Sequence, residues 1–300
     1  MTNYRTLAVP VRGGDLAVGV WGPDDAPTVL ALHGITASHR AWSLVAEALP
    51  SLRIVAPDLR GRARSRSLPG PWGMSTHAED VVAVLDEIGA HSAVVAAHSM
   101  GAFVGATLAR QHPNRVRELI LIDGGLPIPS PEGVAPDDLA EALIGPAVTR
   151  LSMTFESVDA YREFWKKHPG LADDWSASIE QYVDYDLVGV APVLTSSSLF
   201  EAVSQDAVDL GSADGYVAAL AAMTTPLQFV RAPRGFLNDL PGLYPVEAVT
   251  EWKRQIPRLE TLEVSDVNHY TIIMAERGAR EIASLIERTV ARSRSAAQVR

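Results

Sequence analysis

The chain of 300 residues contains no cysteine, which excludes disulfide bonds and thiolate chemistry. It has no run of about 18 apolar residues, the length that a membrane-spanning helix needs. No His-x-His or His-Glu-x-x-His spacing indicates a metal site, and no Gly-x-Gly-x-x-Gly follows the first apolar runs. We therefore expect no metal, no cofactor and no membrane span.

Positive charge is also scarce, with 26 Lys and Arg against 36 Asp and Glu and a net charge of −10. The nearest approach to a basic cluster, RGRARSR at 60–66, contains glycine and serine and favours a loop. Binding to nucleic acid depends on clustered positive charge, so a small-molecule partner is expected instead. The start, MTNYRTLAVPVRGGD, lacks the pattern of a secretory signal. A cytoplasmic monomer or homodimer is the expectation.

Short apolar runs alternate with amphipathic helical patterns along most of the chain. Strand-like runs lie at 16–22, 28–34, 53–59, 93–99, 116–123, 225–232 and 259–266, and helical patterns at 39–50, 76–90, 100–113, 245–257 and 274–293. Strands that are apolar on both faces and separated by helices indicate a parallel sheet covered on both sides. We predict an α/β fold with a mostly parallel, twisted sheet of about eight strands.

The alternation stops between 127 and 224, where helical fragments occur without a clear strand pattern. Such a segment is too long for a loop, and we predict a helical cap (lid) domain over the carboxyl edge of the sheet. Residues 1–126 and 225–300 then form the core, and 127–224 the cap.

The segment VVAAHSMGAF, at 94–103, is an apolar run that ends abruptly at Ser99 among very small residues. A tight strand–turn–helix would hold Ser99 above the sheet and would require the small Ala97 and Gly101 beside it. The helix opening at Met100 would direct its backbone N–H toward an oxyanion at Ser99. The backbone N–H of Ile35, after the sharp turn at Gly34, is the expected second donor.

A serine hydroxyl needs a base to become a strong nucleophile, and the chain has eight histidines. Most of them lie at helix ends or beside the two turns. Only His269, in VSDVNHYTI, follows the last strand and could lie on a loop above the sheet. We predict His269 as the general base.

Four segments in this order, HGIT, DLRGRARS, HSMGA and NH, resemble the α/β-hydrolase superfamily with a cap domain. The resemblance covers nearly the whole chain except the cap. Two positions depart from the family pattern: Ala97 stands at the first glycine of Gly-x-Ser-x-Gly, and Ala63 at the second glycine of the Asp-x-Arg-Gly-x-Gly-x-Ser loop. The resemblance implies a serine hydrolase of esterase or lipase type.

The acid that would orient the histidine has two candidates in this sequence. The family commonly places it after the strand that follows the cap, but positions 232–235 read Ala-Pro-Arg-Gly, and the first carboxylate is Asp239. Asp123, at the end of the strand before the cap, occupies the position that other members use. We predict Asp123 as the acid and Asp239 as the alternative; a purely structural Asp123, bonded to its own turn, is the competing interpretation.

A serine at position 99 argues against the dehalogenases and epoxide hydrolases of this superfamily, which use a carboxylate nucleophile. Cleavage of a small-to-medium apolar ester or lactone through an acyl-serine is the predicted function, with Trp42 and Trp165 as candidate pocket residues. Carbon–carbon bond hydrolysis, cofactor-free oxygenation and a non-enzymatic ligand receptor stay open as alternatives. Turnover of simple esters would distinguish ester cleavage from these three alternatives.

Overall fold

A computed structural model describes residues 3–129, 145, 147, 149–210 and 215–298. An eight-stranded sheet runs through the molecule in the order β1-β2-β4-β3-β5-β6-β9-β10. The strands are β1 (Arg5–Val11), β2 (Gly14–Trp21), β3 (Thr28–Leu32), β4 (Arg53–Pro57), β5 (Ala93–His98), β6 (Val116–Ile122), β9 (Leu227–Arg231) and β10 (Glu260–Glu263). In the part of the sheet from β4 to β10, neighbouring strands pair in parallel. β2 pairs antiparallel with both β1 and β4. The predicted fold class is confirmed.

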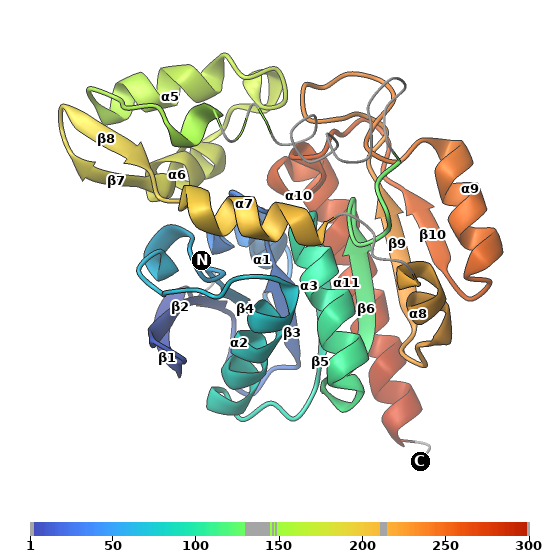
Figure 1. The fold of residues 1–300 in the computed structure, drawn as a ribbon. Coiled ribbons are helices and arrows are strands. Elements are labelled where there is room, and N and C mark those ends of the chain that lie inside the picture. Colours follow the sequence, from blue (N-terminus) through green and yellow to red (C-terminus); the bar gives the residue numbers. More distant parts are fainter. Residues whose placement is uncertain (1–2, 130–144, 146, 148, 211–214, 299–300) are drawn as a thin grey trace.

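Helices cover both faces of this sheet (Figure 1). They are α1 (Ser43–Glu47), α2 (Met74–Glu87), α3 (Met100–Gln111), α9 (Val246–Gln255), α10 (Thr271–Met274) and α11 (Glu276–Gln298). Alternate residues of β5 belong to two different hydrophobic clusters. Val94 and Ala96 belong to the cluster that includes residues of α1 and α11. Val95 and Ala97 belong to the cluster that includes residues of α2 and α3. This two-sided burial explains why the central strands are apolar throughout.

One strand of the sheet, β1, was not among the predicted runs. Its burial alternates along RTLAVPV, and it pairs only with β2 at the edge of the sheet. An edge strand needs only one apolar face and tolerates Pro10, so its sequence lacks the continuous apolar run that marks the central strands.

Between β6 and β9 the described residues 145–222, here called the insertion, contain α5 (Val158–Lys166), α6 (Ala177–Asp186), α7 (Phe200–Asp209) and α8 (Tyr216–Ala222). Figure 1 shows α5 and α6 grouped at one end of the molecule, with α7 between that group and the helices α2 and α3. Residues 130–144, 146, 148 and 211–214 of the predicted cap lie outside the described part.

The expectation that this segment holds no strand is wrong. Two short strands, β7 (Leu187–Val190) and β8 (Val193–Ser196), form an antiparallel hairpin directly after α6. The helical pattern of DWSASIEQYVDYDLV continues into Leu187 and Val188, which concealed the point at which the helix ends at Asp186. Among the helices that the structure describes, none has the length and apolar character needed to span a membrane.

Candidate active site

Ser99 lies in a strained turn between β5 and α3. Its φ of 56° and ψ of −125° fall in a region that residues with a side chain rarely adopt. The turn is closely packed: a Cβ added at Gly101 would lie 2.5 Å from the carbonyl oxygen of Leu32, and one at Gly34 would lie 3.1 Å from the Ser99 Cβ. A Cβ at Gly124 would collide with the Ser99 backbone. Small neighbours are therefore a requirement of this turn.

The loop that carries Ile35 is held against the sheet by His33. The His33 Nδ1–H donates to the carbonyl of Gly34 at 2.8 Å, and the backbone N–H of Leu59 donates to Nε2 at 2.9 Å. Burial lowers the pKa of His33 to about 4, so the ring stays neutral and one tautomer serves both bonds. Ile35 and Ser99 line the same cavity, and Met100 begins α3 beside them.

His269 follows β10 on a loop, and its Nδ1–H donates to Asp123 Oδ2 at 2.7 Å. The other carboxylate oxygen of Asp123 accepts the backbone N–H of Ala232 at 3.0 Å. Asp123 is fully buried and has a φ of 45° directly after β6. The carboxylate thus reaches the histidine across the strand end that separates them, and both of its oxygens are bonded.

The backbone of His269 is fixed by a second histidine. The His98 Nε2–H donates to the carbonyl oxygen of His269 at 2.7 Å, and the two rings lie 4.6 Å apart. Burial, and then the neighbouring His269, lowers the pKa of His98 well below its usual value, so His98 is a neutral support.

Asp239, the alternative acid, lies elsewhere in the loop after β9. It is exposed and lines the cavity, and its backbone carbonyl accepts the N–H of Gly235 at 2.9 Å. No hydrogen bond joins it to His269 in the described residues. The contact that a triad requires is made by Asp123.

Ser99 and His269 open onto a cavity of about 650 Å³ at the carboxyl edge of the sheet. Apolar side chains from the core loops and from the insertion make up most of its wall; they include Ile35, Ile128, Phe164, Trp165, Phe236, Leu237, Leu240, Leu243, Ile273 and Met274. The Ser99 hydroxyl makes no hydrogen bond within the described part of the chain, and such a nucleophile–base pair can close its bond when substrate binds.

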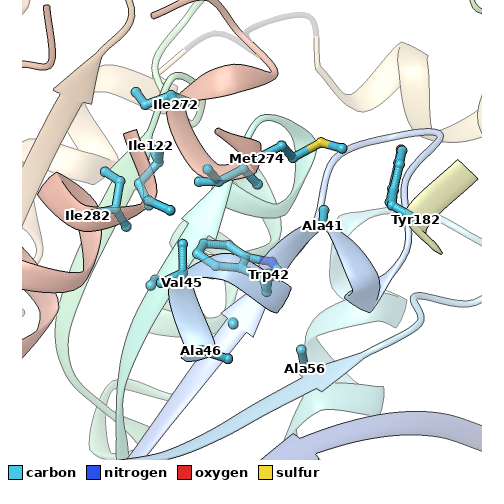
Figure 2. Close-up of a cluster of buried hydrophobic side chains, with 14 of the residues drawn as sticks. Ala41, Trp42, Val45, Ala46, Ala56, Ile122, Tyr182, Ile272, Met274 and Ile282 are labelled. Carbon is cyan, nitrogen blue, oxygen red and sulfur yellow. The ribbon is translucent and has the colours of Figure 1, made fainter. Parts of the chain in front are cut away.

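The two predicted pocket tryptophans occupy different places. Trp165, on α5, lines the cavity. Trp42 is fully buried and does not line it; Figure 2 shows Trp42 packed near Val45 and Met274 in the core. Ala41, its neighbour in sequence, reaches the cavity wall in its place, since successive helical residues face different directions.

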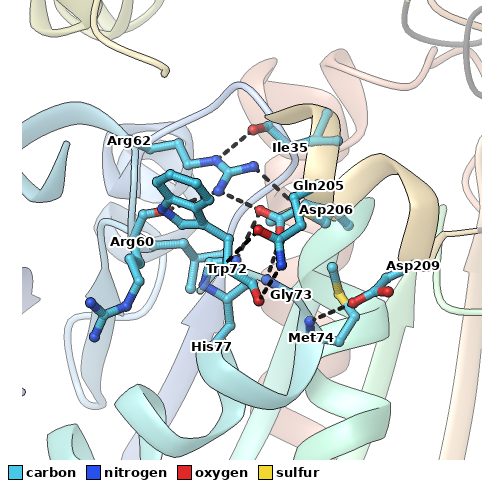
Figure 3. Close-up of polar contacts among 12 residues, drawn as sticks. Ile35, Arg60, Arg62, Trp72, Gly73, Met74, His77, Gln205, Asp206 and Asp209 are labelled. Carbon is cyan, nitrogen blue, oxygen red and sulfur yellow. Dashed lines mark hydrogen bonds and ion pairs between the residues drawn. The ribbon is translucent and has the colours of Figure 1, made fainter. Parts of the chain in front are cut away.

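A buried ion pair joins the insertion to the Ile35 loop, as Figure 3 shows. Arg62 Nε–H donates to the carbonyl oxygen of Ile35 at 2.9 Å, and its Nη1 lies 2.5 Å from Asp206 of α7. Asp206 also accepts the backbone N–H of Gly73 at 2.6 Å and pairs with His77 Nε2 at 2.9 Å. The position of α7 is thereby coupled to the position of the Ile35 peptide.

This network was not found from the sequence. RGRARSR does form a loop, but Arg60 and Arg62 are fully buried within it. Their carboxylate partners, Asp80 and Asp206, lie far along the chain, and no local pattern marks such a pairing. Within the described residues, no group of three or more His, Cys, Asp or Glu side chains could hold a metal ion.

Comparisons with known proteins identify the family and the fold of this chain. The family model described as "alpha/beta hydrolase fold" matches residues 27–243. The chain is 38% identical over 109 residues to the lipase LipV of Mycobacterium tuberculosis, and this match covers 36% of the chain and 41% of LipV. It is 32% identical over 130 residues to the bifunctional esterase/perhydrolase DCH of Acinetobacter calcoaceticus, covering 42% of the chain and 47% of DCH.

These matches span less than half the length of either curated relative. The crystal structure of E-2-(acetamidomethylene)succinate hydrolase resembles the chain with a TM-score of 0.78 at 22% identity, over 95% of this chain and 100% of that one. That likeness shows a shared fold. With the family model matching most of the sequence, the chain belongs to the α/β-hydrolase fold family.

Proposed function

We propose that this protein is a serine hydrolase that cleaves a small-to-medium ester or lactone through an acyl-serine intermediate. The observation that carries the proposal is the 2.7 Å bond from His269 to the buried Asp123, on the cavity that a strained Ser99 also lines. The names of two relatives, a lipase and an esterase/perhydrolase, support ester chemistry.

In this mechanism Ser99 Oγ attacks the carbonyl carbon of the ester while His269 Nε2 takes the serine proton. Asp123 holds the ring in the required tautomer and stabilises the imidazolium that forms. The backbone N–H groups of Ile35 and Met100 stabilise the oxyanion of the tetrahedral intermediate. His269 returns the proton to the departing alcohol. Water then attacks the acyl-serine while His269 takes its proton, and the acid leaves as the proton returns to Ser99 Oγ.

We further propose that residues 127–224 act as a cap domain over a hydrolase core formed by 1–126 and 225–300. The cavity wall includes Phe164 and Trp165 from α5 as well as core residues, so substrate would be enclosed between the two parts. Excluding water there strengthens the interactions of the oxyanion with its donors.

Hydrolysis of p-nitrophenyl esters from acetate to decanoate, by the wild type and by Ser99→Ala, tests the proposal. We expect turnover that falls to background in Ser99→Ala and an optimum of acyl-chain length that reflects the cavity. Absence of turnover by the wild type would refute the ester assignment. Carbon–carbon bond hydrolysis and oxygen uptake would then be the next assays, with His269 as the base.

A further inference from the structure

Arg150 is a buried charged side chain in the wall of the cavity that Ser99 lines. It is 3% exposed and comes from the part of the insertion that precedes α5. Its guanidinium carbon lies 5.1 Å from the ring centroid of Trp165, another wall residue. A cation is costly to bury, so its surroundings indicate what it is placed to bind.

Only one nitrogen of Arg150 is bonded by the described residues. Its Nη1 donates to the hydroxyl of Tyr161 and to Asp186 Oδ2, both at 2.6 Å. Burial acts to lower the pKa of Arg150, but Tyr161 and Asp186 more than offset it and raise the pKa above its usual value. The guanidinium is therefore charged, while its Nε and Nη2 have no partner within the described part of the chain.

Asp186 balances the charge of Arg150 but contacts only one of its nitrogens, because other donors occupy the rest of the carboxylate. The hydroxyls of Tyr161, Ser196 and Ser197 and the backbone N–H of Ser197 all donate to its carboxylate. With so many donors the carboxylate is satisfied through a single nitrogen of Arg150. As far as the described residues go, the rest of the guanidinium fork can bind another acceptor.

Three further donors line the cavity near Arg150. The hydroxyls of Tyr182 and Tyr270 have no partner among the described residues. Burial raises the pKa of Tyr270 to about 12 and raises that of Tyr182 as well, so both hydroxyls keep their protons. His168 Nδ1 accepts the backbone N–H of Gly170 at 3.1 Å, which leaves the ring proton on Nε2 as a donor.

These four side chains, Arg150, His168, Tyr182 and Tyr270, form what we call the donor cluster. His168 and Tyr270 lie beside Trp165, whose ring centroid is 5.3 Å from that of His168 and 6.4 Å from that of Tyr270, and Tyr182 lines the same cavity. The cluster borders the reacting groups, because the rings of Tyr270 and His269 lie 5.8 Å apart. A wholly apolar substrate would leave its donors desolvated and unpaired, which is unfavourable.

We propose that the donor cluster is an anion-binding subsite, and that the substrate is an ester that carries a carboxylate apart from the bond cleaved at Ser99. The carboxylate accepts hydrogen bonds from the open edge of Arg150 and from the hydroxyls of Tyr182 and Tyr270. The apolar wall receives the body of the same molecule. The inference rests on the proposed ester cleavage and adds a specificity to it. Asp239 is a carboxylate that also lines the cavity. Because it is exposed to solvent, its electrostatic repulsion of an anion at the donor cluster is screened.

The carboxylate could belong to the acyl part or to the alcohol part of the ester, and two substrate pairs separate these. The first compares p-nitrophenyl hydrogen adipate with its methyl ester; the second compares 4-(butyryloxy)benzoate with its methyl ester. We expect kcat/KM of the wild type to favour the acid in one pair by roughly ten- to a hundredfold, the range of hydrogen bonds to a charged group. In Arg150→Met this ratio should fall to about one, and in Arg150→Lys to an intermediate value.

Arg162→Met is the matched control. Arg162 lies on α5 of the same insertion and pairs with Asp184 at 2.6 Å, but it does not line the cavity. Its loss should leave the ratio of the two esters at the wild-type value. Tyr182→Phe with Tyr270→Phe keeps the Arg150–Asp186 pair intact, so this double variant tests the subsite if Arg150→Met fails to fold. We expect it to lower the ratio severalfold.

Calorimetric titration of Ser99→Ala with adipate and with dimethyl adipate separates a failed subsite from a failed ester assignment. Adipate binding that weakens roughly tenfold or more when Arg150→Met or the double tyrosine variant is added supports the subsite, even if no ester is cleaved. Equal binding of adipate with and without these changes, or no adipate binding, overturns it. So does a wild type that cleaves the neutral ester of each pair as well as or better than the acid.

Discussion

The two polar regions of the cavity are built in opposite ways. Around Ser99, the acid and the histidine already have their hydrogen bonds: both carboxylate oxygens of Asp123 are bonded, and His98 fixes the backbone of His269. Around Arg150, the fold supplies donors, several of which have no acceptor within the part of the chain that the structure describes. This difference fits the two proposals, because groups that move protons must be oriented in advance, whereas a recognition site keeps its hydrogen-bonding capacity for the ligand.

The two regions also differ in where their residues lie in the fold. Ser99 and Asp123 directly follow β5 and β6, which are adjacent parallel strands, so both lie at the carboxyl edge of the sheet. Both have a positive φ, a strain that the surrounding sheet and close glycine contacts maintain. Arg150, by contrast, lies in the insertion and is bonded to Tyr161 of α5 and Asp186 of α6, and Ser196 of the hairpin donates to Asp186.

The largest effect expected from a single charge-removing change is at Asp123. Asp123→Asn keeps the shape but favours the wrong tautomer of His269, so kcat should fall by about 10⁴-fold, as loss of a triad acid typically does. Asp239→Asn serves as the comparison and should change kcat by no more than a few-fold. Steady-state turnover of p-nitrophenyl butyrate measures both. The reverse ranking would assign the acid to Asp239 and break the account of the Ser99 region.

The predictability of the Ser99 region follows from its location at strand ends. Ser99 and Asp123 could be proposed because each follows a buried apolar run that marks a strand, and His269 because it alone among the histidines follows the last predicted strand. The fold class was predictable for the same reason. The edge strand β1 was missed because it lacks such a run.

A smaller effect is expected where the insertion meets the core. Burial acts to raise the pKa of Asp206, but the hydrogen bond from His77 and the charge of Arg62 more than offset it, so the pKa lies below 3.8. Asp206→Asn leaves Arg62 buried without its counter-charge and should cost roughly 3–5 kcal/mol of stability. Thermal or urea unfolding of the two proteins at neutral pH measures this difference.

The sign of the pH dependence follows from the lowered pKa. Between the folded and the unfolded pKa values of Asp206 the unfolded chain binds more protons, so its contribution to stability is complete above about pH 4 and is lost as the pH falls through the folded pKa. The stability difference between wild type and Asp206→Asn should shrink correspondingly in acid. A difference that stays constant from pH 7 to about pH 2 would show that the charge of Asp206 contributes nothing.

The smallest effects distinguish the two tryptophans. Trp165→Phe alters the cavity wall and should shift KM and the preferred acyl-chain length by a few-fold, with stability little changed. Trp42→Phe leaves a void in the core and should cost roughly 1–3 kcal/mol while the chain-length preference stays the same. Ester profiles and unfolding curves of both variants test this; a changed profile in Trp42→Phe would place that side chain in contact with substrate.

The insertion could not be derived from the sequence to the same depth. Arg150 contacts Asp186, and Arg62 contacts Asp206, across long stretches of chain that no periodicity connects. Side-chain pairs of this kind are specified only by tertiary packing. Both tryptophans were predicted as pocket residues, and only Trp165 lines the cavity. The sequence could not distinguish them, since a buried and a cavity-lining tryptophan have the same local pattern.

The central claim is that Ser99 is the nucleophile, and covalent labelling tests it most directly. The wild type would be treated with a p-nitrophenyl phosphonate, digested, and mapped by mass spectrometry, with Ser99→Ala and His269→Ala in parallel. We expect one phosphonylated site, Ser99, labelled with loss of esterase activity, slow labelling in His269→Ala and none in Ser99→Ala. Label on another residue together with ester turnover that persists in Ser99→Ala would contradict the account.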